Sequence, residues 1–434
     1  MKNSIVLLIL VLFSTIIYLV SCNKESRTTD FDHTSSHFVS INEAENEVLS
    51  LAQTIDSPTR SKGSRRISSR QTVINAKTRS TTETSPIYYV FQFEDNAGFA
   101  LASADRRTAP VFCITDSGEF PGFSSTDNPG FRLALDAIDQ YYRILTGLPI
   151  YDDNGELVEA NDAKVLFRLD PPDDTCEYYY PDPGTCIQLW QIESRNGAIL
   201  PTRWGQGAPF NHYCFTADSL NALVGCAAVA VGQIMYSHQL DYSYNGTYYS
   251  WDYMASILRS NSDSTNYIGW NLVQHLLADL GRPENLDMEY GLNGSSASYA
   301  NVPRTFNNFG YTHSGTLTDF DALSIKSWVS AGPLYGRGAM SGVGGHAWVF
   351  DEVITRVRKV FQGSTPNSPY TIEHDELVHI NWGWYGEADG YYVPGVFNVM
   401  AGPVNPRDDS HPFVGMPPYY FNSYLKVYHS ISPD

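Results

Sequence analysis

Four short motifs contain side chains that could together break and form an acyl bond. Gln206 lies between two glycines, and Cys226 follows a glycine at the start of an apolar stretch. His346 follows another pair of glycines, and Asn381 and Trp382 end an apolar segment further along the chain. A thiolate can act as nucleophile, an imidazole as general base and acid, and an amide as oxyanion donor or histidine support. The sequence therefore contains the groups that acyl transfer requires.

Cys226 begins a run of small and apolar residues, 226–238, whose spacing predicts a helix. At the first turn of a helix, backbone N–H groups lack partners and the dipole is positive, so a thiol ionises more readily there. This placement favours a nucleophile. The alternative is a small buried hydrophobic side chain, which describes most cysteines outside disulfides.

The other candidate groups each have an ordinary structural alternative. Gln206 could donate its amide hydrogens to a developing oxyanion, or it could be a surface residue in a turn. His346 could be a packed core histidine or the base for Cys226, which lies 120 residues upstream (346 − 226). That separation is close to the roughly 130–150 residues of the papain pattern. Asn381 could accept an N–H of the imidazole, while indole rings such as that of Trp382 shield the bond from water.

Other chemistries fit the sequence less well. His374 and His379 lie close together, but no H-E-x-x-H motif and no third ligand at metal-site spacing accompany them, so we expect no metal. The glycines within 336–342 precede a predicted strand, whereas a nucleotide-binding loop would precede a helix. We therefore expect no cofactor. The net charge of −19 argues against nucleic acid as a partner.

Together, the motifs resemble those of the streptopain family of papain-like cysteine peptidases. The resemblance covers about residues 190–430, and the matching segments are Gly-Gln-Gly-Ala-Pro-Phe-Asn at 205–211, Gly-Cys-Ala-Ala-Val-Ala-Val-Gly-Gln-Ile-Met at 225–235, Gly-Gly-His-Ala-Trp-Val-Phe-Asp at 344–351 and His-Ile-Asn-Trp-Gly-Trp at 379–384. It implies an α+β fold with a papain-like two-lobed peptidase domain. One lobe would be helical around the cysteine helix and the other an antiparallel β lobe, with a small α+β prodomain before them.

The resemblance also implies roles for single residues. Cys226 would be the nucleophile and His346 the general base and acid. Gln206 and the backbone N–H of Cys226 would form the oxyanion hole. Asn381 and Trp382 would support the histidine, and the sequence leaves open which of them contacts it. The implied activity is hydrolysis of protein or peptide substrates through a thioester.

The resemblance extends to the substrate cleft and to the N-terminal region. The loop 290–298 is similar to the family's substrate-cleft loop, and Ser296 and Gly345 match its substrate-contacting positions. The hairpin 88–105 is similar to the family's inhibitory propeptide. This implies a zymogen whose own propeptide acts as an intramolecular inhibitor until proteolysis removes it.

Two segments depart from the family pattern, and both bear on substrate preference. Residues 352–376 predict an additional hairpin, and the proline-rich segment 402–418 stands where the family has a glycine-rich loop. The main alternative function is a non-catalytic binding or inhibitory lipoprotein on the same fold. Acyl transfer to an amine is a third possibility, because it would use the same catalytic residues.

The first 22 residues predict export. Lys2 precedes an apolar run at 5–20, which is short for a membrane span of roughly 20 residues. The run ends in Leu-Val-Ser-Cys, which resembles a bacterial lipobox and predicts a membrane anchor through lipid at Cys22. We expect an exported protein at the cell envelope or outer surface, or one secreted after processing. An ordinary signal peptide or anchor is the alternative.

The remaining chain divides at a predicted linker, 169–186, which is rich in proline and aspartate. Residues 23–186 are expected to form the propeptide with a flexible tether, and 187–434 the peptidase domain. The basic, Ser/Thr-rich segment 56–85 is expected to be mobile. The propeptide pattern predicts a helix at 42–52, strands at 87–93, 99–104 and 111–115, and a helix between 128 and 147.

The cysteines and the linker bear on maturation. If Cys22 carries lipid, five cysteines remain, so at least one is unpaired, and Cys226 is the obvious candidate. Cys176 and Cys186 could form a disulfide in an oxidising compartment. We expect activation by cleavage within 185–200, near Arg195.

Overall fold

The computed structural model describes residues 37–56, 65–74, 86–123, 125–146, 148, 190–340, 344–361, 368–397 and 425–433. Three predicted features lie outside the described residues: the export segment with Cys22, the linker with Cys176 and Cys186, and the proline-rich segment 402–418. Within the described part, no helix is long and apolar enough to span a bilayer.

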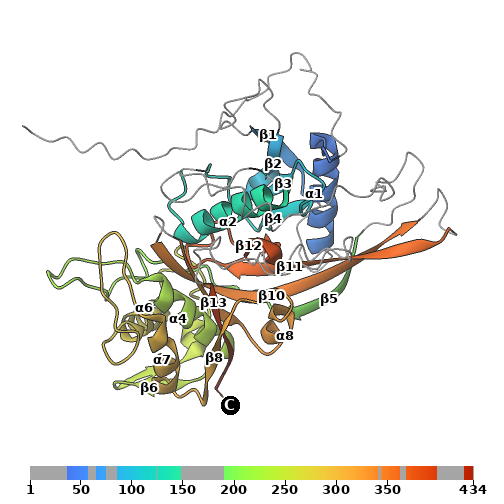
Figure 1. Cartoon of the computed structure of the whole chain (residues 1–434). Helices are drawn as coiled ribbons and strands as arrows, with labels where there is room; N and C mark the ends of the chain where they lie inside the picture. The colour runs from blue at the N-terminus through green and yellow to red at the C-terminus, as the bar shows by residue number, and fades with distance from the viewer. Residues whose placement is uncertain are drawn as a thin grey trace, which may run out of the picture.

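An antiparallel sheet of eleven strands extends through the described part of the chain (Figure 1). Its strands follow the order β1-β2-β3-β4-β12-β11-β10-β9-β13-β8, and β5 pairs with β10 beside this path. The strands are β1 (Ile67–Ile74), β2 (Pro86–Phe93), β3 (Phe99–Ser103), β4 (Val111–Thr115), β5 (Gln191–Gly197), β8 (His313–Asp319), β9 (Leu334–Met340), β10 (Gly344–Phe361), β11 (Tyr370–Asn381), β12 (Gly390–Tyr392) and β13 (Lys426–Ser432). A separate small sheet consists of β6 (Tyr242–Tyr244) and β7 (Thr247–Tyr249).

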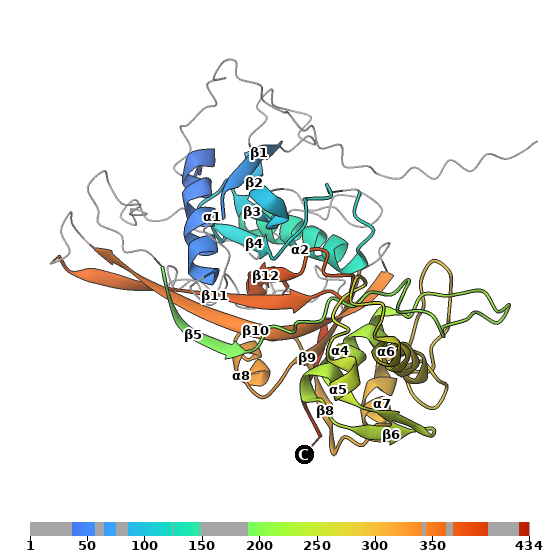
Figure 2. The same ribbon diagram turned by 180° about the vertical axis from the view of Figure 1, so that it is seen from behind.

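Helices gather at three places around the large sheet (Figures 1 and 2). Two lie over its N-terminal strands, four cluster beside β8, and one packs against β10 on the other side of the sheet. In chain order these are α1 (Ile41–Ile55) and α2 (Pro129–Thr146); α4 (Cys226–His238), α5 (Trp251–Met254), α6 (Tyr267–Leu280) and α7 (Val302–Asn308); and α8 (Ile325–Val329). Short 3-10 turns are η1 (Glu94–Asn96), η2 (Tyr299–Asn301) and η3 (Pro394–Phe397).

The described apolar side chains form two cores, and α4 lies at the centre of one of them. Residues Ala227–Tyr236 of α4 are all buried. Around them pack side chains from the neighbouring helices, including Leu277 of α6 and Phe306 of α7. The second core lies between the large sheet and helices α1, α2 and α8. The predicted α+β fold, with a helical lobe around the cysteine helix and an antiparallel β lobe, is confirmed.

The N-terminal region forms the predicted helices and strands. Ser40 caps α1, since its Oγ accepts a hydrogen bond from the backbone N–H of Glu43 at 3.3 Å. Asn128 caps α2 in the same way, with Oδ1 3.0 Å from Gly130 N and 3.1 Å from Phe131 N. These side chains satisfy N–H groups that a helix start leaves without partners, which explains where both helices begin.

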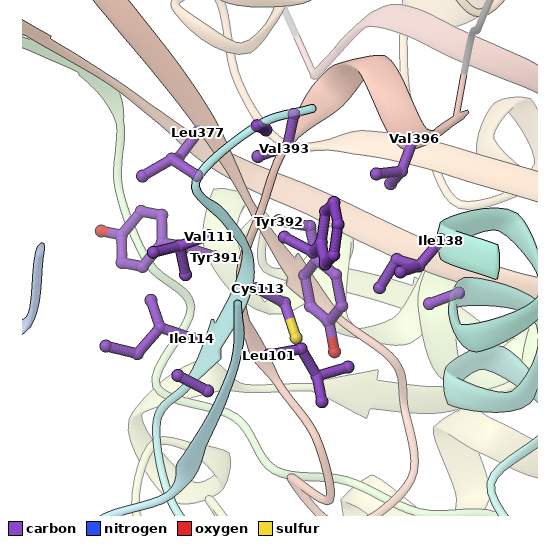
Figure 3. Packing of buried hydrophobic residues seen from close by; sticks show 14 of the residues in the cluster. Leu101, Val111, Cys113, Ile114, Ile138, Leu377, Tyr391, Tyr392, Val393 and Val396 are labelled. Carbon is purple, nitrogen blue, oxygen red and sulfur yellow. The ribbon is translucent and has the colours of Figure 1, made fainter. Parts of the chain in front are cut away.

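The N-terminal strands join those of the C-terminal part in one sheet. β4 pairs with β12, so that Thr115 lies opposite Gly390 and Cys113 opposite Tyr392. Figure 3 shows the apolar side chains at this junction, where Leu101 and Cys113 lie beside Tyr392. The sequence predicts two successive domains and gives no sign of this strand pairing between them.

The expectation of a mobile segment at 56–85 is wrong for Ile67–Ile74, which forms β1. This strand pairs with β2, and its Val73 is buried. Arg70 forms an ion pair with Glu45 of α1, with 2.5 Å between Nη2 and Oε1. Pairing with an apolar neighbouring strand thus orders a sequence whose composition alone indicates mobility.

The segment around Arg195, where we expected the activating cleavage, forms the strand β5. Arg195 lies in β5 opposite Ile354 of β10, and its guanidinium donates to Glu352 at 2.8 Å and to the carbonyl of Ile55 at 3.0 Å. The predicted hairpin at 352–376 is present as the outer part of the long β10–β11 pair. β5 is thus a regular strand paired with β10, which makes Arg195 a poor site for proteolysis.

Candidate active site

Cys226 is the first residue of α4, at the end of a backbone turn that requires glycine. Gly225 has φ = 91°, a conformation that other residues rarely adopt. A Cβ atom on Gly225 would also lie 2.7 Å from Cε of Met288. The Gly-Cys motif therefore reflects a tight entry into the helix. Gly225 offers no side-chain cap, so the thiol lies beside N–H groups without capping partners.

The structure brings Cys226 and His346 into hydrogen-bonding contact. Burial raises the pKa of the Cys226 thiol, but His346 and the backbone N–H groups of Ala347 and Ala227 outweigh burial and lower the pKa below its usual value. The other described free cysteines differ: burial raises the pKa of Cys113 to about 12 and that of Cys214 to about 11. Among the described cysteines, only Cys226 is therefore suited to act as a thiolate.

His346 is held by the backbone of Trp382. The side chain is buried in β10, and Nε2 lies 2.8 Å from the carbonyl oxygen of Trp382. Because a carbonyl only accepts, Nε2 carries a hydrogen, and Nδ1 is left to exchange a proton with the thiol. The indole rings of Trp382 and Trp348 lie at centroid distances of 6.3 and 6.4 Å from the imidazole. These rings exclude water from one side of the histidine.

The interpretation that the Asn381 side chain orients the imidazole by accepting its N–H is wrong. Its Oδ1 instead accepts from Gln233 Nε2 and from the backbone N–H of Gly383, both at 3.0 Å. Its Nδ2 donates to the carbonyl of Thr202 at 2.7 Å. Asn381 thus connects α4 to the turn after β11, and the histidine's partner is the carbonyl of Trp382.

The loop that carries Gln206 is fixed on both sides of this residue. The carbonyl of Gln206 accepts the backbone N–H of Val224 at 2.7 Å, two residues before Cys226. The hydroxyl of Tyr385 accepts the N–H of Gly207 at 2.7 Å. Gln206 itself is buried. The structure therefore brings its main chain beside the segment that enters α4.

Ser296 and Gly345 occupy exposed positions at the edges of this region. Ser296 bridges to Glu289 across a short antiparallel contact, with 3.3 Å between Oγ and Oε2. Its neighbour Ser295 contacts the entry to α4 more directly, since its Oγ donates to the carbonyl of Leu223 at 2.6 Å. Gly345 directly precedes His346 in β10. Both predicted substrate-contacting residues thus lie on segments adjoining the Cys226–His346 pair.

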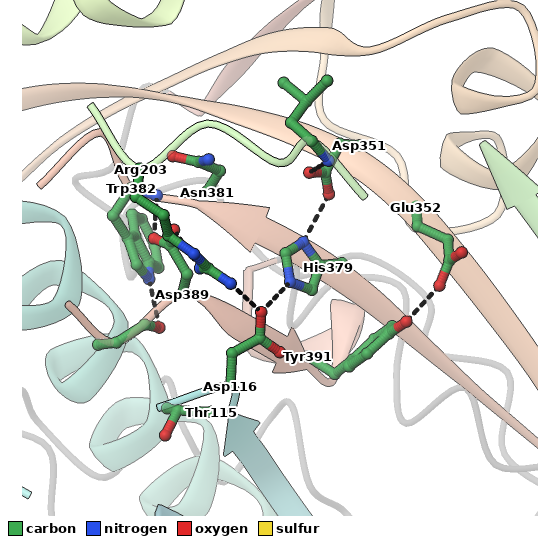
Figure 4. A network of polar contacts seen from close by, with 12 residues as sticks. Thr115, Asp116, Arg203, Asp351, Glu352, His379, Asn381, Trp382, Asp389 and Tyr391 are labelled. Carbon is green, nitrogen blue, oxygen red and sulfur yellow. Dashed lines mark hydrogen bonds and ion pairs between the residues drawn. The ribbon is translucent and has the colours of Figure 1, made fainter. Parts of the chain in front are cut away.

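A buried network of ion pairs adjoins Trp382, whose backbone N–H donates to Asp389 at 2.8 Å. We call it the base-side network, and its members are Asp351, His379, Asp116, Arg203 and Asp389 (Figure 4). His379 lies between two carboxylates, with Nδ1 2.6 Å from Asp351 and Nε2 3.3 Å from Asp116. Arg203 joins Asp116 to Asp389 at 2.7 and 2.8 Å. Burial opposes the charge on His379, but Asp351 and Asp116 outweigh it and raise its pKa to about 10.

From the sequence, His379 is only a candidate metal ligand and the first residue of the motif 379–384, and no role is predicted for the other members of the network. Within the described residues, no group of three His, Cys, Asp or Glu side chains is arranged to hold a metal. The motifs do give partial signals, because Arg203 adjoins the Gln206 loop and Asp351 ends the His346 motif. Asp116 and Asp389 lie outside every motif, and only the fold brings them here.

The N-terminal region also covers His346 directly. Gly130, in the first turn of α2, lies so close that an added Cβ would be 2.3 Å from Cε3 of Trp382 and 2.6 Å from Cδ2 of His346. A real Cβ does not approach other atoms this closely, so only glycine fits. Together with Asp116 and the β4–β12 pairing, this contact places the N-terminal region on the histidine side of the site.

Two family sequence models match the chain in succession. Residues 36–142 match the Spi protease inhibitor model, and residues 204–392 match the Peptidase C10 family model. Streptopain of Streptococcus pyogenes is 29% identical over 215 residues, which cover 42% of this chain and 48% of streptopain. The thiol protease/hemagglutinin PrtT of Porphyromonas gingivalis is 23% identical over 366 residues, which cover 76% of this chain and 37% of PrtT. The chain spans about half the length of the first relative and less of the second.

Among solved structures, a fragment of prointerpain A of Prevotella intermedia is similar to this chain at 19% sequence identity. The alignment covers 79% of this chain and 95% of that one, with a TM-score of 0.47.

Proposed function

We propose that this chain, which belongs to the Peptidase C10 family and carries a Spi-type inhibitor region before its peptidase region, is a cysteine endopeptidase made as a zymogen. The observation that carries the proposal is the pairing of Cys226 with His346 at the start of α4, together with the lowered pKa of this thiol. A thiolate paired with an imidazole can cleave amide bonds, so we propose proteins or peptides as substrates.

In the proposed reaction, the Cys226 thiolate attacks the substrate carbonyl carbon while His346 is protonated. The tetrahedral oxyanion accepts hydrogen bonds from the backbone N–H of Cys226 and the amide of Gln206. His346 then donates its proton to the leaving amine, and the C–N bond breaks to give a thioester. Water, deprotonated by His346, attacks the thioester, the C–S bond breaks, and the released thiolate forms the starting ion pair with the protonated His346.

The zymogen proposal is supported by the contacts of the N-terminal region. Gly130 lies on the ring of His346, Asp116 is inserted between His379 and Arg203, and β4 continues the sheet through β12. An N-terminal region held in this way hinders a substrate at the histidine side. Proteases cut exposed, irregular chain more readily than a paired strand, so we propose that the activating cut lies before Gln191 of β5 and not at Arg195.

We further propose export and a lipid anchor at Cys22, on the strength of the apolar run and the lipobox-like end of residues 1–22. Cell fractionation of the wild-type chain and of Cys22→Ser tests this. The wild-type chain is expected in the membrane fraction, and Cys22→Ser is expected to leave it. Equal distribution of both would contradict the anchor.

Casein hydrolysis tests the central assignment. Wild-type chain after processing is expected to cleave casein and to take up one equivalent of an epoxide inhibitor of cysteine peptidases. Cys226→Ala, processed by an added protease, should do neither, whereas Cys214→Ala keeps the active thiol and serves as the control. A Cys226→Ala protein that hydrolyses casein at the wild-type rate would refute the assignment. Neither cleavage nor labelling by wild type would favour a binding protein, and amide transfer without hydrolysis would favour an acyltransferase.

A further inference from the structure

We propose that Asp389 and Arg203 are positioning residues for His346, and that they act through the backbone of Trp382. The inference rests on the proposed peptidase function and names two residues that no motif in the sequence contains. Neither side chain touches His346. Both act on the strand-end turn that supplies the hydrogen-bond acceptor of the imidazole.

Hydrogen bonds connect these groups in an unbroken series, of which Figure 4 shows Trp382, Asp389 and Arg203. His346 Nε2 donates to the carbonyl of Trp382 at 2.8 Å. The backbone N–H of the same residue donates to Asp389 Oδ1 at 2.8 Å. Asp389 Oδ2 in turn accepts from Arg203 Nη1 at 2.8 Å. The carboxylate of Asp389 therefore fixes the backbone of the residue whose carbonyl holds the catalytic imidazole.

Neighbouring contacts leave this backbone little freedom. The peptide unit whose carbonyl accepts from His346 has the N–H of Gly383 at its other end, and that N–H donates to Asn381 Oδ1 at 3.0 Å. The indole Nε1 of Trp382 donates to the carbonyl of Ala388 at 3.2 Å, directly before Asp389. Side-chain acceptors thus hold the N–H groups on both sides of the Trp382 carbonyl. Asn381 orients one peptide plane and Asp389 the other.

The charge on Asp389 depends on Arg203. Asp389 is completely buried, and burial raises the pKa of its carboxyl to about 6, against the opposing effects of Arg203, the Trp382 N–H and His379. A buried carboxylate without a cation is costly, so Arg203 is what keeps this acceptor ionised. The other charged groups facing Asp389 are His379 and Asp116, the latter also bound to Arg203.

Loss of this support should change catalysis and leave substrate binding intact. A carbonyl that moves by a fraction of an ångström reorients the imidazole relative to the thiol, and small misplacements of a catalytic group cost up to about 100-fold in rate. We expect Asp389→Asn to lower kcat about 10-fold to 100-fold with KM nearly unchanged. The apparent pKa of Cys226 should rise, since a poorly placed imidazolium stabilises the thiolate less.

The test compares processed wild type, Asp389→Asn, Arg203→Lys and Asp279→Asn. The asparagine keeps the shape and one acceptor but removes the charge. Arg203→Lys keeps a cation but lacks the planar guanidinium that donates to Asp389 Oδ2. Asp279 of α6 is the matched control, because it is also a buried aspartate and accepts from Tyr249 at 2.6 Å outside the base-side network. For each protein we would measure kcat, KM, thermal stability and the pH dependence of Cys226 alkylation by iodoacetamide.

The inference predicts lower kcat and an alkylation profile shifted to higher pH in Asp389→Asn, smaller changes of both in Arg203→Lys, and neither in Asp279→Asn. A purely structural role would lower thermal stability without moving the alkylation profile. A folded Asp389→Asn with wild-type kcat and profile would overturn the inference; if that variant fails to fold, the same outcome in Arg203→Lys would overturn it. A wild-type enzyme that cleaves no peptide would instead refute the proposed function.

Discussion

Different kinds of interaction hold the two sides of the candidate site in place. The proposed nucleophile, Cys226, begins a helix whose next ten residues are buried among apolar side chains of α5, α6 and α7. The proposed base, His346, is bound by Trp382, which is in turn bound by Asp389 of the base-side network. In that network, Arg203 and His379 share buried carboxylates. Packing therefore places the thiol, whereas charge and hydrogen bonding place the imidazole.

This difference indicates which side of the site can be regulated by pH or by a bound segment. Apolar packing responds to volume and hardly at all to pH, while buried ion pairs respond to both charge and partner loss. The N-terminal region touches the charged side, through Asp116 and Gly130. In the proposed zymogen, the N-terminal region can thus act on His346 and leave the helix that begins at Cys226 undisturbed.

The largest expected effect concerns packing on the nucleophile side. A Cβ on Gly232 of α4 would lie 3.1 Å from Trp204 and 3.2 Å from Leu277, so Gly232→Leu should overpack this core. We expect a loss of at least about 3 kcal/mol in unfolding free energy, the upper part of the usual range for overpacking. Urea unfolding of the Cys226→Ala chain with and without Gly232→Leu measures it. Gly294→Ala is the control, because a Cβ there meets no atom within 4 Å. Equal midpoints for Gly232→Leu and its parent would refute the packing argument.

The second prediction concerns pH on the base side. His379 has its pKa raised from 6.5 to about 10, so folding stabilises its charged form. That contribution is fully present below about pH 6.5 and is lost as the pH rises through 10. Stability of the full-length Cys226→Ala chain should therefore fall by a few kcal/mol between neutral pH and about pH 10. Constant stability across this range would show that the His379 ion pairs contribute no net stability.

The third and smallest expected effect concerns the contact between α2 and His346. In Gly130→Ala, the added methyl would overlap Trp382 and His346, so the N-terminal region should bind less well over the site. We expect epoxide labelling of Cys226 in the unprocessed chain to become about 10-fold faster, equivalent to about 1.4 kcal/mol. Loss of helix stability is not the cause, since alanine favours a helix over glycine.

Two comparisons make the Gly130→Ala result specific. Arg132→Ala removes an exposed side chain from the same turn of α2 and should leave the labelling rate unchanged. After processing, Gly130→Ala and wild type should react equally fast, because the substituted segment is gone. Slower or unchanged labelling of unprocessed Gly130→Ala would mean that α2 does not obstruct the site.

The nucleophile side could be predicted from the sequence because its determinants are contiguous. Gly225, Cys226 and the following apolar residues specify the turn, the helix start and its burial within one short segment. The histidine motif is also local, so the pairing of Cys226 with His346 followed from the order of the motifs. The Trp382 carbonyl could not be identified as the partner of His346 from the sequence, because every residue has a backbone carbonyl.

The base-side network could not be predicted because its members come from distant segments. Asp116 follows β4, Arg203 precedes the Gln206 loop, and Asp389 precedes β12. They meet only because β4 pairs with β12, a contact between strands of five and three residues without a distinctive pattern. The same pairing explains why the chain forms one continuous sheet where composition suggests two domains.

The most direct test of the central claim is the pH dependence of Cys226 alkylation in the processed wild type and in His346→Ala. If His346 stabilises the thiolate, wild-type Cys226 will react with iodoacetamide well below the usual thiol pKa of about 8.5, and His346→Ala will shift the profile up toward that value. Mass spectrometry of the alkylated peptides assigns the reaction to Cys226 and not to Cys214. Identical profiles for the two proteins would contradict a Cys226–His346 ion pair.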